Sequence, residues 1–347
     1  MEATRACTKL QLLLMSEEED PGEVQVEIQD QPSAQAQASD DYFHSYSDLS
    51  VHELMLRDQP RLTAYSDCIE KNAHLFQSKV VLDVGCGTGI LSLFAARAGA
   101  RKVYAVEASE MHKKAETLIK ENGYSDTIEI IHDVVENVKL PEKVDVIISE
   151  WMGFYLLHES MLASVIDARE RLLKEGGIVI PSTGKIYICP VAMEHFRKQH
   201  VDYWKAYHGF DFSSIGDEIM TAKMSTPFVE QISSSELLSR PQEFTNIDFN
   251  KVETAELVSL TGDFSFEVER TAQMAGFAFW FDCDFTLESS FPIILDTSPS
   301  SEPTHWKQTT VFLGVFADVQ KGEQVEVKVT MQQDDMNPRH YSISIQS

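Results

Sequence analysis

The sequence predicts an α/β fold in which a doubly wound parallel sheet is followed by an antiparallel β-barrel domain. Between residues 39 and 180, short apolar runs alternate with helical stretches, a pattern that is typical of βαβ units. From residue 181 to residue 347, strands rich in aromatic and β-branched side chains alternate with turn-forming residues. The sequence therefore predicts two domains, one of each type.

The chain begins with a segment that is not expected to fold. Residues 16–40 are acidic, rich in Gln, Ala, Ser and Pro, and almost free of large apolar side chains. Such a composition cannot offset the entropy lost on ordering, so we assign residues 1–38 to a disordered acidic tail. The apolar run LQLLLM in this segment is too short for a signal peptide or a membrane span. We expect a soluble, intracellular protein.

Four strands and two helices are predicted in the first domain. The strands are VVLDV (80–84), KVYAVEA (102–108), TIEIIHD (127–133) and KVDVIIS (143–149), of which the first, second and fourth are apolar enough to be buried on both faces. The helices are residues 91–99 and 109–123; Ser109 is a candidate N-cap for the second, and both end at glycine.

The second domain is predicted from strands of alternating polarity. These are KIYICPV, FSFEVER, FAFWFDCDF, TTVFLGV and EQVEVKVTM. The first of them is separated from the rest by an irregular aromatic stretch, VDYWKAYHGFDFSSI (201–215). This stretch is either core filler or a projecting arm that contacts a partner.

Composition excludes some classes of function. The net charge of −26 argues against a nucleic-acid binder that works through a basic patch. It suits a basic partner, such as an Arg- or Lys-rich protein, or simply an acidic soluble protein. The five cysteines are scattered without a CxxC pair, which favours a reducing compartment and predicts no zinc or other metal site.

A glycine loop, VLDVGCGTG (81–89), follows the first strand and leads into a helix. Gly85, Gly87 and Gly89 permit a tight turn and close approach of a ligand to the backbone. Their GxGxG spacing differs from the GxGxxG dinucleotide fingerprint, which disfavours NAD. The next strand ends at Glu107, whose carboxylate can accept hydrogen bonds from both hydroxyls of a ribose. This pattern resembles that of the class I S-adenosylmethionine-dependent methyltransferases.

Two carboxylates lie near the two ends of the aromatic stretch SEWMGFYLLHES (149–160). Glu150 follows the fourth strand, and Glu159 ends the loop. Ligands of open α/β sheets bind at the carboxyl ends of the strands, so Glu150 and the glycine loop are expected to share one cleft. A pair of carboxylates suits a guanidinium, which is planar and always charged, better than a rounder lysine ammonium.

These motifs together resemble the protein arginine methyltransferases, and the resemblance covers almost the whole chain from about residue 40. It rests on YFHSY (42–46), VHELMLRDQPR (51–61), the glycine loop, VYAVEAS (103–109), the loop SEWMGFYLLHESM and THWKQ (304–308). The resemblance is to enzymes of type I, which transfer methyl groups from S-adenosylmethionine to arginine, release S-adenosylhomocysteine and form monomethylarginine and asymmetric dimethylarginine.

The resemblance implies a role for each of a set of residues. The donor is expected to contact Tyr42, His52, Met55, Arg61, Asp83, Gly85, Gly87, Glu107 and Glu136. Arg61 is expected to bind the carboxylate of the donor, and His52 is expected nearby on the same helix. Glu107 is expected to bind the ribose of the donor, and Glu136 its adenine. The catalytic residues are expected to be Glu150, Glu159, His305 and Asp58, with His305 and Asp58 paired across the two domains. The target arginine is expected to contact Tyr46, Met161 and Trp306.

Other expectations also follow from the resemblance. Met55 and Met161 shape the target pocket, and in this family methionines at these positions accompany the asymmetric product. Residues from about 195 to 222 are expected to form the arm through which two copies of the chain make a homodimer. Histone tails and Arg/Gly-rich proteins are the expected partners, in the nucleus, the cytoplasm or both, with no direct contact to nucleic acid or membrane.

One departure from the family and two alternatives stay open at this stage. The family usually has tyrosine at Phe154, so a methyltransferase fold kept as a binding or coregulator module with weak activity is the first alternative. A small-molecule or nucleic-acid methyltransferase is the second, and the acidic charge and paired glutamates disfavour it. The proton acceptor is either Glu159 or the His305–Asp58 pair.

Overall fold

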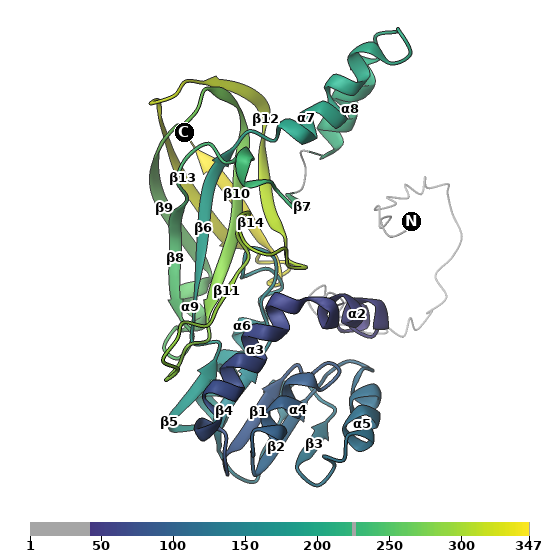
Figure 1. The fold of residues 1–347 in the computed structure, drawn as a ribbon, viewed down its shortest axis with the longest axis vertical. Helices are drawn as coiled ribbons and strands as arrows, with labels where there is room; N and C mark the ends of the chain where they lie inside the picture. Colours follow the sequence, from purple (N-terminus) through teal and green to yellow (C-terminus); the bar gives the residue numbers. More distant parts are fainter. Residues whose placement is uncertain (1–41, 224–226, 347) are drawn as a thin grey trace, which may run out of the picture.

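The computed structural model describes residues 42–223 and 227–346, so the predicted tail, residues 1–38, lies outside the described residues. Two domains, each built on a different kind of β-sheet, follow one another along the chain (Figure 1). The parallel sheet lies at one end of the molecule, and the antiparallel sheets form the other end. No helix among the described residues is long and apolar enough to cross a bilayer.

The first domain is built on a parallel sheet of five strands in the order β3-β2-β1-β4-β5. Its strands are β1 (Val80–Val84), β2 (Lys102–Val106), β3 (Ile128–Ile131), β4 (Val144–Ser149) and β5 (Leu173–Ile180). All five residues of β1 are buried, because helices cover both faces of such a sheet. The four predicted strands and the doubly wound arrangement are confirmed, and β5 is an additional strand.

Among the described residues, five α-helices of eight or more residues accompany this sheet. They are α2 (Leu49–Arg57), α3 (Gln59–Lys71), α4 (Ile90–Arg97), α5 (His112–Glu121) and α6 (Leu162–Leu172). The prediction that Ser109 is the N-cap of α5 is wrong, because the cap is Met111 and the helix begins at His112. The Ser109 hydroxyl instead accepts the Met111 N–H at 3.2 Å, in the turn that precedes the helix.

A single residue, Asp58, separates α2 from α3. Its extended backbone (φ −73°, ψ 94°) ends α2, and its side chain accepts the Arg61 N–H at the start of α3. Pro60 in the first turn of α3 lacks the N–H that a continuous helix would need. His52 and Arg61 are therefore on two helices, which corrects the prediction that they share one.

The second domain consists of two antiparallel sheets. The larger has the order β7-β12-β10-β6-β8, with β11 on β10; its strands are β6 (Thr183–Val191), β7 (Phe228–Glu230), β8 (Gln242–Asp248), β10 (Ala272–Asp284), β11 (Ile294–Asp296) and β12 (Gln308–Val319). The smaller has the order β14-β13-β9, with β9 (Ser259–Glu267), β13 (Gln324–Gln333) and β14 (Tyr341–Gln346). Buried side chains of both sheets join one core that is continuous with the parallel domain.

Two helices leave the larger sheet and project from the side of the molecule (Figure 1). They are α7 (Glu194–His200) and α8 (Ser213–Lys223), joined by a 3₁₀ helix at Asp202–Ala206. Tyr203 and Phe210, in the connection between α7 and α8, are 55% and 68% exposed. The aromatic stretch 201–215 is thus a projecting arm and not core filler. A further short helix, α9 (Thr254–Leu257), precedes β9.

Candidate active site

A cavity lies at the carboxyl ends of the parallel strands, where open α/β sheets bind their ligands. The glycine loop after β1, the end of β2 and the loop after β4 form its walls. Twelve of the predicted site residues line it: Tyr42, Tyr46, His52, Met55, Arg61, Gly85, Gly87, Glu107, Glu136, Glu150, Glu159 and Met161. Asp83, Asp58, His305 and Trp306 are not among its lining residues.

The glycine loop is shaped to lie against a ligand. Gly85 and Gly87 have φ values of +71° and +54°, which side-chain-bearing residues rarely adopt. A Cβ at Gly85 would clash with the methyl group of Met161, and one at Gly87 would lie 3.1 Å from the His52 ring. Any other residue at these positions would therefore fill the cavity or displace its walls.

Glu107 is held at the end of β2 by backbone donors. One carboxylate oxygen accepts the Gly87 N–H at 2.7 Å and the other accepts the Ser109 N–H at 2.8 Å. These bonds fix the carboxylate against the glycine loop, while each oxygen keeps a second lone pair for a hydroxyl group of a ligand. Glu136 lies farther along the wall, where its carboxylate accepts the Ser164 hydroxyl at 2.6 Å.

Asp83 lies fully buried in β1, next to the glycine loop. One of its oxygens accepts the Ser92 hydroxyl at 2.6 Å, and the other has no hydrogen-bond partner among the described residues. Burial raises the pKa of Asp83 to about 7, although the bond from Ser92 opposes the shift. Asp83 does not line the cavity, but its negative charge next to the glycine loop favours a ligand that carries a positive charge.

Asp83→Asn is expected to stabilise the free protein in a pH-dependent way. The pKa of Asp83 is higher in the folded chain than in the unfolded chain, so its ionisation above pH 4 opposes folding, increasingly up to about pH 7. The variant should gain more unfolding free energy at pH 7.5 than at pH 5.5, as measured by urea unfolding, while donor binding weakens. An equal gain at both pH values would contradict the raised pKa.

Arg61 and Glu150 form a buried ion pair across the cavity wall. The Arg61 Nε and one terminal nitrogen both lie 3.0 Å from the same Glu150 oxygen. The side chains are only 7% and 9% exposed. A further guanidinium nitrogen donates to the Met55 carbonyl at 3.2 Å. The sequence analysis assigns Arg61 to the donor and Glu150 to the target arginine. The structure brings these two side chains into direct contact.

The loop from Glu150 to Met161, which we call the double-glutamate loop, contains unusual backbone. Tyr155, Leu156, Glu159 and Ser160 all have positive φ, between 44° and 75°. Such values cost free energy in residues with side chains, so neighbouring groups must hold them in place. The loop presents Glu150 and Glu159 to the same cavity.

Glu159 accepts the hydroxyl of Tyr46 at 2.8 Å. Burial raises the pKa of the Glu159 carboxyl above its ordinary value, and the nearby charge of Glu150 adds to the shift, while the Tyr46 hydrogen bond opposes it. Burial also raises the pKa of Tyr46, which therefore stays protonated and donates. The Tyr42 hydroxyl, one turn earlier, lies 3.8 Å from the Met161 sulfur.

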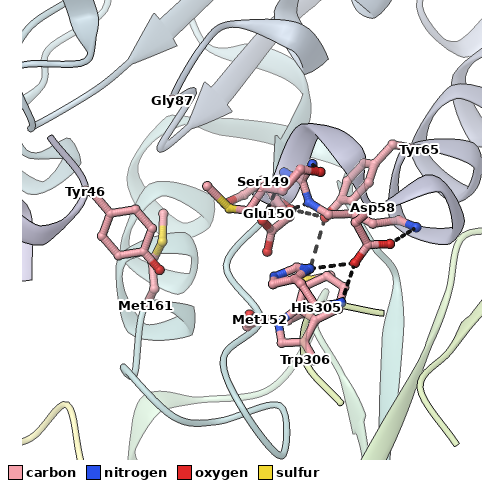
Figure 2. Close-up of polar contacts among 12 residues, drawn as sticks. Tyr46, Asp58, Tyr65, Gly87, Ser149, Glu150, Met152, Met161, His305 and Trp306 are labelled. Atoms are coloured by element: carbon pink, nitrogen blue, oxygen red, sulfur yellow. Dashed lines mark hydrogen bonds and ion pairs between the residues drawn. The ribbon is translucent and has the colours of Figure 1, made fainter. Parts of the chain in front are cut away.

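His305 and Trp306 come from the second domain and lie next to Asp58 and Met152 (Figure 2). The backbone N–H and Nδ1 of His305 lie 2.8 and 2.6 Å from one oxygen of Asp58. Burial favours the neutral form of Asp58, but the hydrogen bonds from His305 and the Arg61 N–H outweigh it and lower the pKa. The pair thus joins the α2–α3 junction to the antiparallel domain.

Trp306, which is predicted to contact the target arginine, is not among the lining residues of the cavity. Its indole is 3% exposed and donates to the Met152 carbonyl at 2.6 Å. Trp306 therefore supports the double-glutamate loop from its far side, because a side chain that fills the interdomain core cannot also line the cavity. Phe154 also lies outside the lining; its ring is 5.7 Å from that of His158.

Arg339 is a lining residue that the sequence does not reveal. It lies in the turn between β13 and β14, where a single arginine has no recognisable spacing to the other site residues. Its guanidinium carbon is 3.8 Å from the ring centre of Tyr42, and one of its nitrogens donates to the Glu159 carbonyl at 3.2 Å. Only the fold brings this residue to the cavity.

A doubly wound sheet, a glycine cradle and a ribose-type carboxylate are typical of nucleotide-binding enzymes. Together with the GxGxG spacing and the match to a methyltransferase domain, they assign this domain to the S-adenosylmethionine-dependent methyltransferases. When bound, S-adenosylmethionine supplies an electrophilic methyl group on a sulfonium. The sequence of residues 81–177 matches the family model of a methyltransferase domain. The sequence of residues 182–347 matches the family model of the arginine methyltransferase oligomerization subdomain.

The chain belongs to the protein arginine methyltransferase family. It is 41% identical over 308 residues to protein arginine N-methyltransferase 6 of Danio rerio, with 88% of each chain covered. It is 38% identical over 338 residues to a probable protein arginine N-methyltransferase 6 of Arabidopsis thaliana, covering 88% of this chain and 78% of the relative. The predicted family and the predicted donor are thereby confirmed.

Solved structures give the same result. The PRMT1 enzyme–prozyme heterotetrameric complex of Trypanosoma brucei with AdoHcy has a TM-score of 0.79 and 38% identity, covering 87% of this chain and 93% of that one. A crystal structure of PRMT6 with SAH has a TM-score of 0.73 and 30% identity, covering 86% and 99%.

Proposed function

We propose that this protein arginine methyltransferase is a type I enzyme, which forms monomethylarginine and asymmetric dimethylarginine on histones and Arg/Gly-rich proteins. The observation that carries the proposal is the pair of carboxylates, Glu150 and Glu159, that line one cavity with Met55 and Met161. The net charge of −26 favours basic protein substrates.

The paired glutamates would act mainly by orientation. A guanidinium nitrogen is a poor nucleophile because its lone pair is delocalised, so the reaction depends on holding this nitrogen in line with the methyl group. Glu150 and Glu159 can accept charge-assisted hydrogen bonds from the other nitrogens, which keeps the positive charge away from the attacking one. Arg61, already bonded to Glu150, links this orientation to the donor side of the cavity.

Glu159 is the proton acceptor that this geometry supports. Glu159 lines the cavity, whereas His305 and Asp58 are not among the lining residues. Its raised pKa makes its carboxylate a better base than an ordinary glutamate. Asp58 and His305 would then serve to join the domains beneath the site.

The type of product tests the proposal. Purified protein would be incubated with isotope-labelled S-adenosylmethionine and core histones, and the methylarginines would be separated after hydrolysis. Asymmetric dimethylarginine is the expected end product. Symmetric dimethylarginine, or monomethylarginine alone at long incubation, would overturn the type I proposal, and label on an Arg/Gly-rich peptide but not on histones would correct the substrate class.

We also infer that the chain forms a homodimer through the arm. The match to the oligomerization subdomain and the exposure of Tyr203, Phe210 and Ile215 (55%, 68% and 39%) support this inference. Light scattering is expected to give twice the chain's 39.2 kDa, and Tyr203→Asp with Phe210→Asp to give a monomer. A monomer for the unmodified chain, with full activity, would contradict the inference.

A further inference from the structure

The turn between β13 and β14, residues 334–340, contacts the double-glutamate loop at several points. The Ser160 hydroxyl donates to the Pro338 carbonyl, and the Gln333 side-chain amide bonds to both of these groups. The ring of His340 stacks 5.2 Å from that of His158. This turn therefore supports the part of the loop whose backbone has positive φ.

Arg339 makes a reciprocal contact with Glu159. The Glu159 N–H donates to the Arg339 carbonyl at 2.7 Å, and the Arg339 guanidinium donates to the Glu159 carbonyl at 3.2 Å. Both main-chain polar groups of Glu159 are thus bound to one residue. Because Glu159 has a φ of +75°, these two bonds help to keep it in a conformation that it would otherwise leave.

The same guanidinium also packs on the segment that begins the described chain. Residues 42–45 form a helical turn, and the Arg339 carbon lies 3.8 Å from the ring centre of Tyr42 and 5.3 Å from that of Phe43. A guanidinium over an aromatic face gives a cation–π attraction. Tyr42, Phe43 and Tyr46 all line the cavity, so this segment forms one of its walls.

We propose that Arg339 is a positioning residue that holds residues 42–46 over the donor site and at the same time sets the position of Glu159. It does not touch the reacting atoms; it acts through Tyr42 and through the Glu159 backbone. Closure of the cavity and placement of the catalytic carboxylate are then coupled through one side chain. Only the role of Glu159 in this inference rests on the proposed function.

Arg339→Ala is the first test, measured as S-adenosylhomocysteine affinity by calorimetry and its release rate by stopped flow. These readouts need no arginine substrate, so they are independent of which methylarginine the enzyme forms. The variant is expected to bind S-adenosylhomocysteine roughly tenfold more weakly, mainly through faster release, because the wall that Tyr42 belongs to loses its support. Arg240→Ala, at a side chain that is 92% exposed, is the matched control.

A double-mutant cycle separates positioning from general support. Tyr42→Leu and Arg339→Ala should together weaken S-adenosylhomocysteine binding by much less than the product of their separate effects, because both break the same contact. Arg339→Lys should recover part of the affinity, since an ammonium can still lie over the ring. If the alanine variant does not fold, Arg339→Lys is measured in its place, and a partial loss of S-adenosylhomocysteine affinity is then the expected result.

Three outcomes would overturn the inference. The first is a folded Arg339→Ala variant whose S-adenosylhomocysteine affinity stays within twofold of the unmodified protein. The second is a loss of thermal stability with no change in affinity or release rate, which is the result of a purely structural role. The third is an independent, multiplicative effect of the two substitutions in the cycle.

Discussion

Glu159→Gln is expected to lower kcat by at least a hundredfold, on the order of what removal of one transition-state contact costs elsewhere, while S-adenosylhomocysteine affinity changes by less than about threefold. The amide keeps the size of the side chain and can still accept the Tyr46 hydroxyl, which now lies 2.8 Å from the carboxylate. It loses the negative charge and the ability to take a proton. Isotope-transfer kinetics and calorimetry on one preparation measure both quantities.

The pH profile gives a second view of the same carboxylate. Because the pKa of Glu159 is raised, the unmodified enzyme should lose activity on acidification at a higher pH than an ordinary glutamate, whose pKa is 4.5, would dictate. Activity is lost as the pH falls, since only the ionised form binds a guanidinium. Glu121→Gln, at an exposed position in the last turn of α5, is the control and should leave kcat unchanged. Full activity of Glu159→Gln would exclude the catalytic role.

Arg61→Met is expected to destabilise the protein by about 3–5 kcal/mol, because it leaves the carboxylate of Glu150 buried without its partner. The side chains of this ion pair are 7% and 9% exposed, so water can replace the lost contact only in part. Donor binding should be lost as well. Urea unfolding measures the first effect and calorimetry with S-adenosylhomocysteine the second.

Adding Glu150→Gln to Arg61→Met distinguishes these two roles of the arginine. The double variant contains no unpaired buried charge, so most of the lost unfolding free energy should return, while donor binding should not. Arg57→Met serves as the control, since Arg57 pairs with Glu53 at the surface and both side chains are more than half exposed. An Arg61→Met variant as stable as the unmodified protein would show that the pair contributes nothing to folding.

Much of the parallel domain could be predicted because its signals are local. Strands buried on both faces form continuous apolar runs, and Gly85 and Gly87 occur where a strand turns into a helix. The contact between Arg61 and Glu150 was not predictable, because the two residues are 89 positions apart and each has a separate role in the family pattern.

The remaining differences arise from tertiary packing. Asp58 interrupts what reads as a single helical motif, and its role as a cap becomes clear only from its backbone angles. Trp306 belongs to a recognisable motif, yet the interdomain core decides where its indole lies. Arg339 has no sequence signal at all, since its partners Tyr42 and Glu159 lie far away in the chain and in different elements.

The supports of the double-glutamate loop have a consequence for how the enzyme is made. Trp306 and Arg339 contact this loop from positions 154 and 180 residues later in the chain. A ribosome synthesises the donor-binding sheet first, and domains generally fold in that order. A nascent chain can therefore acquire a nucleotide pocket well before Glu159 is fixed in place. If Arg339 sets the position of Glu159 as proposed, methyl transfer is expected only after the β13–β14 turn has been translated.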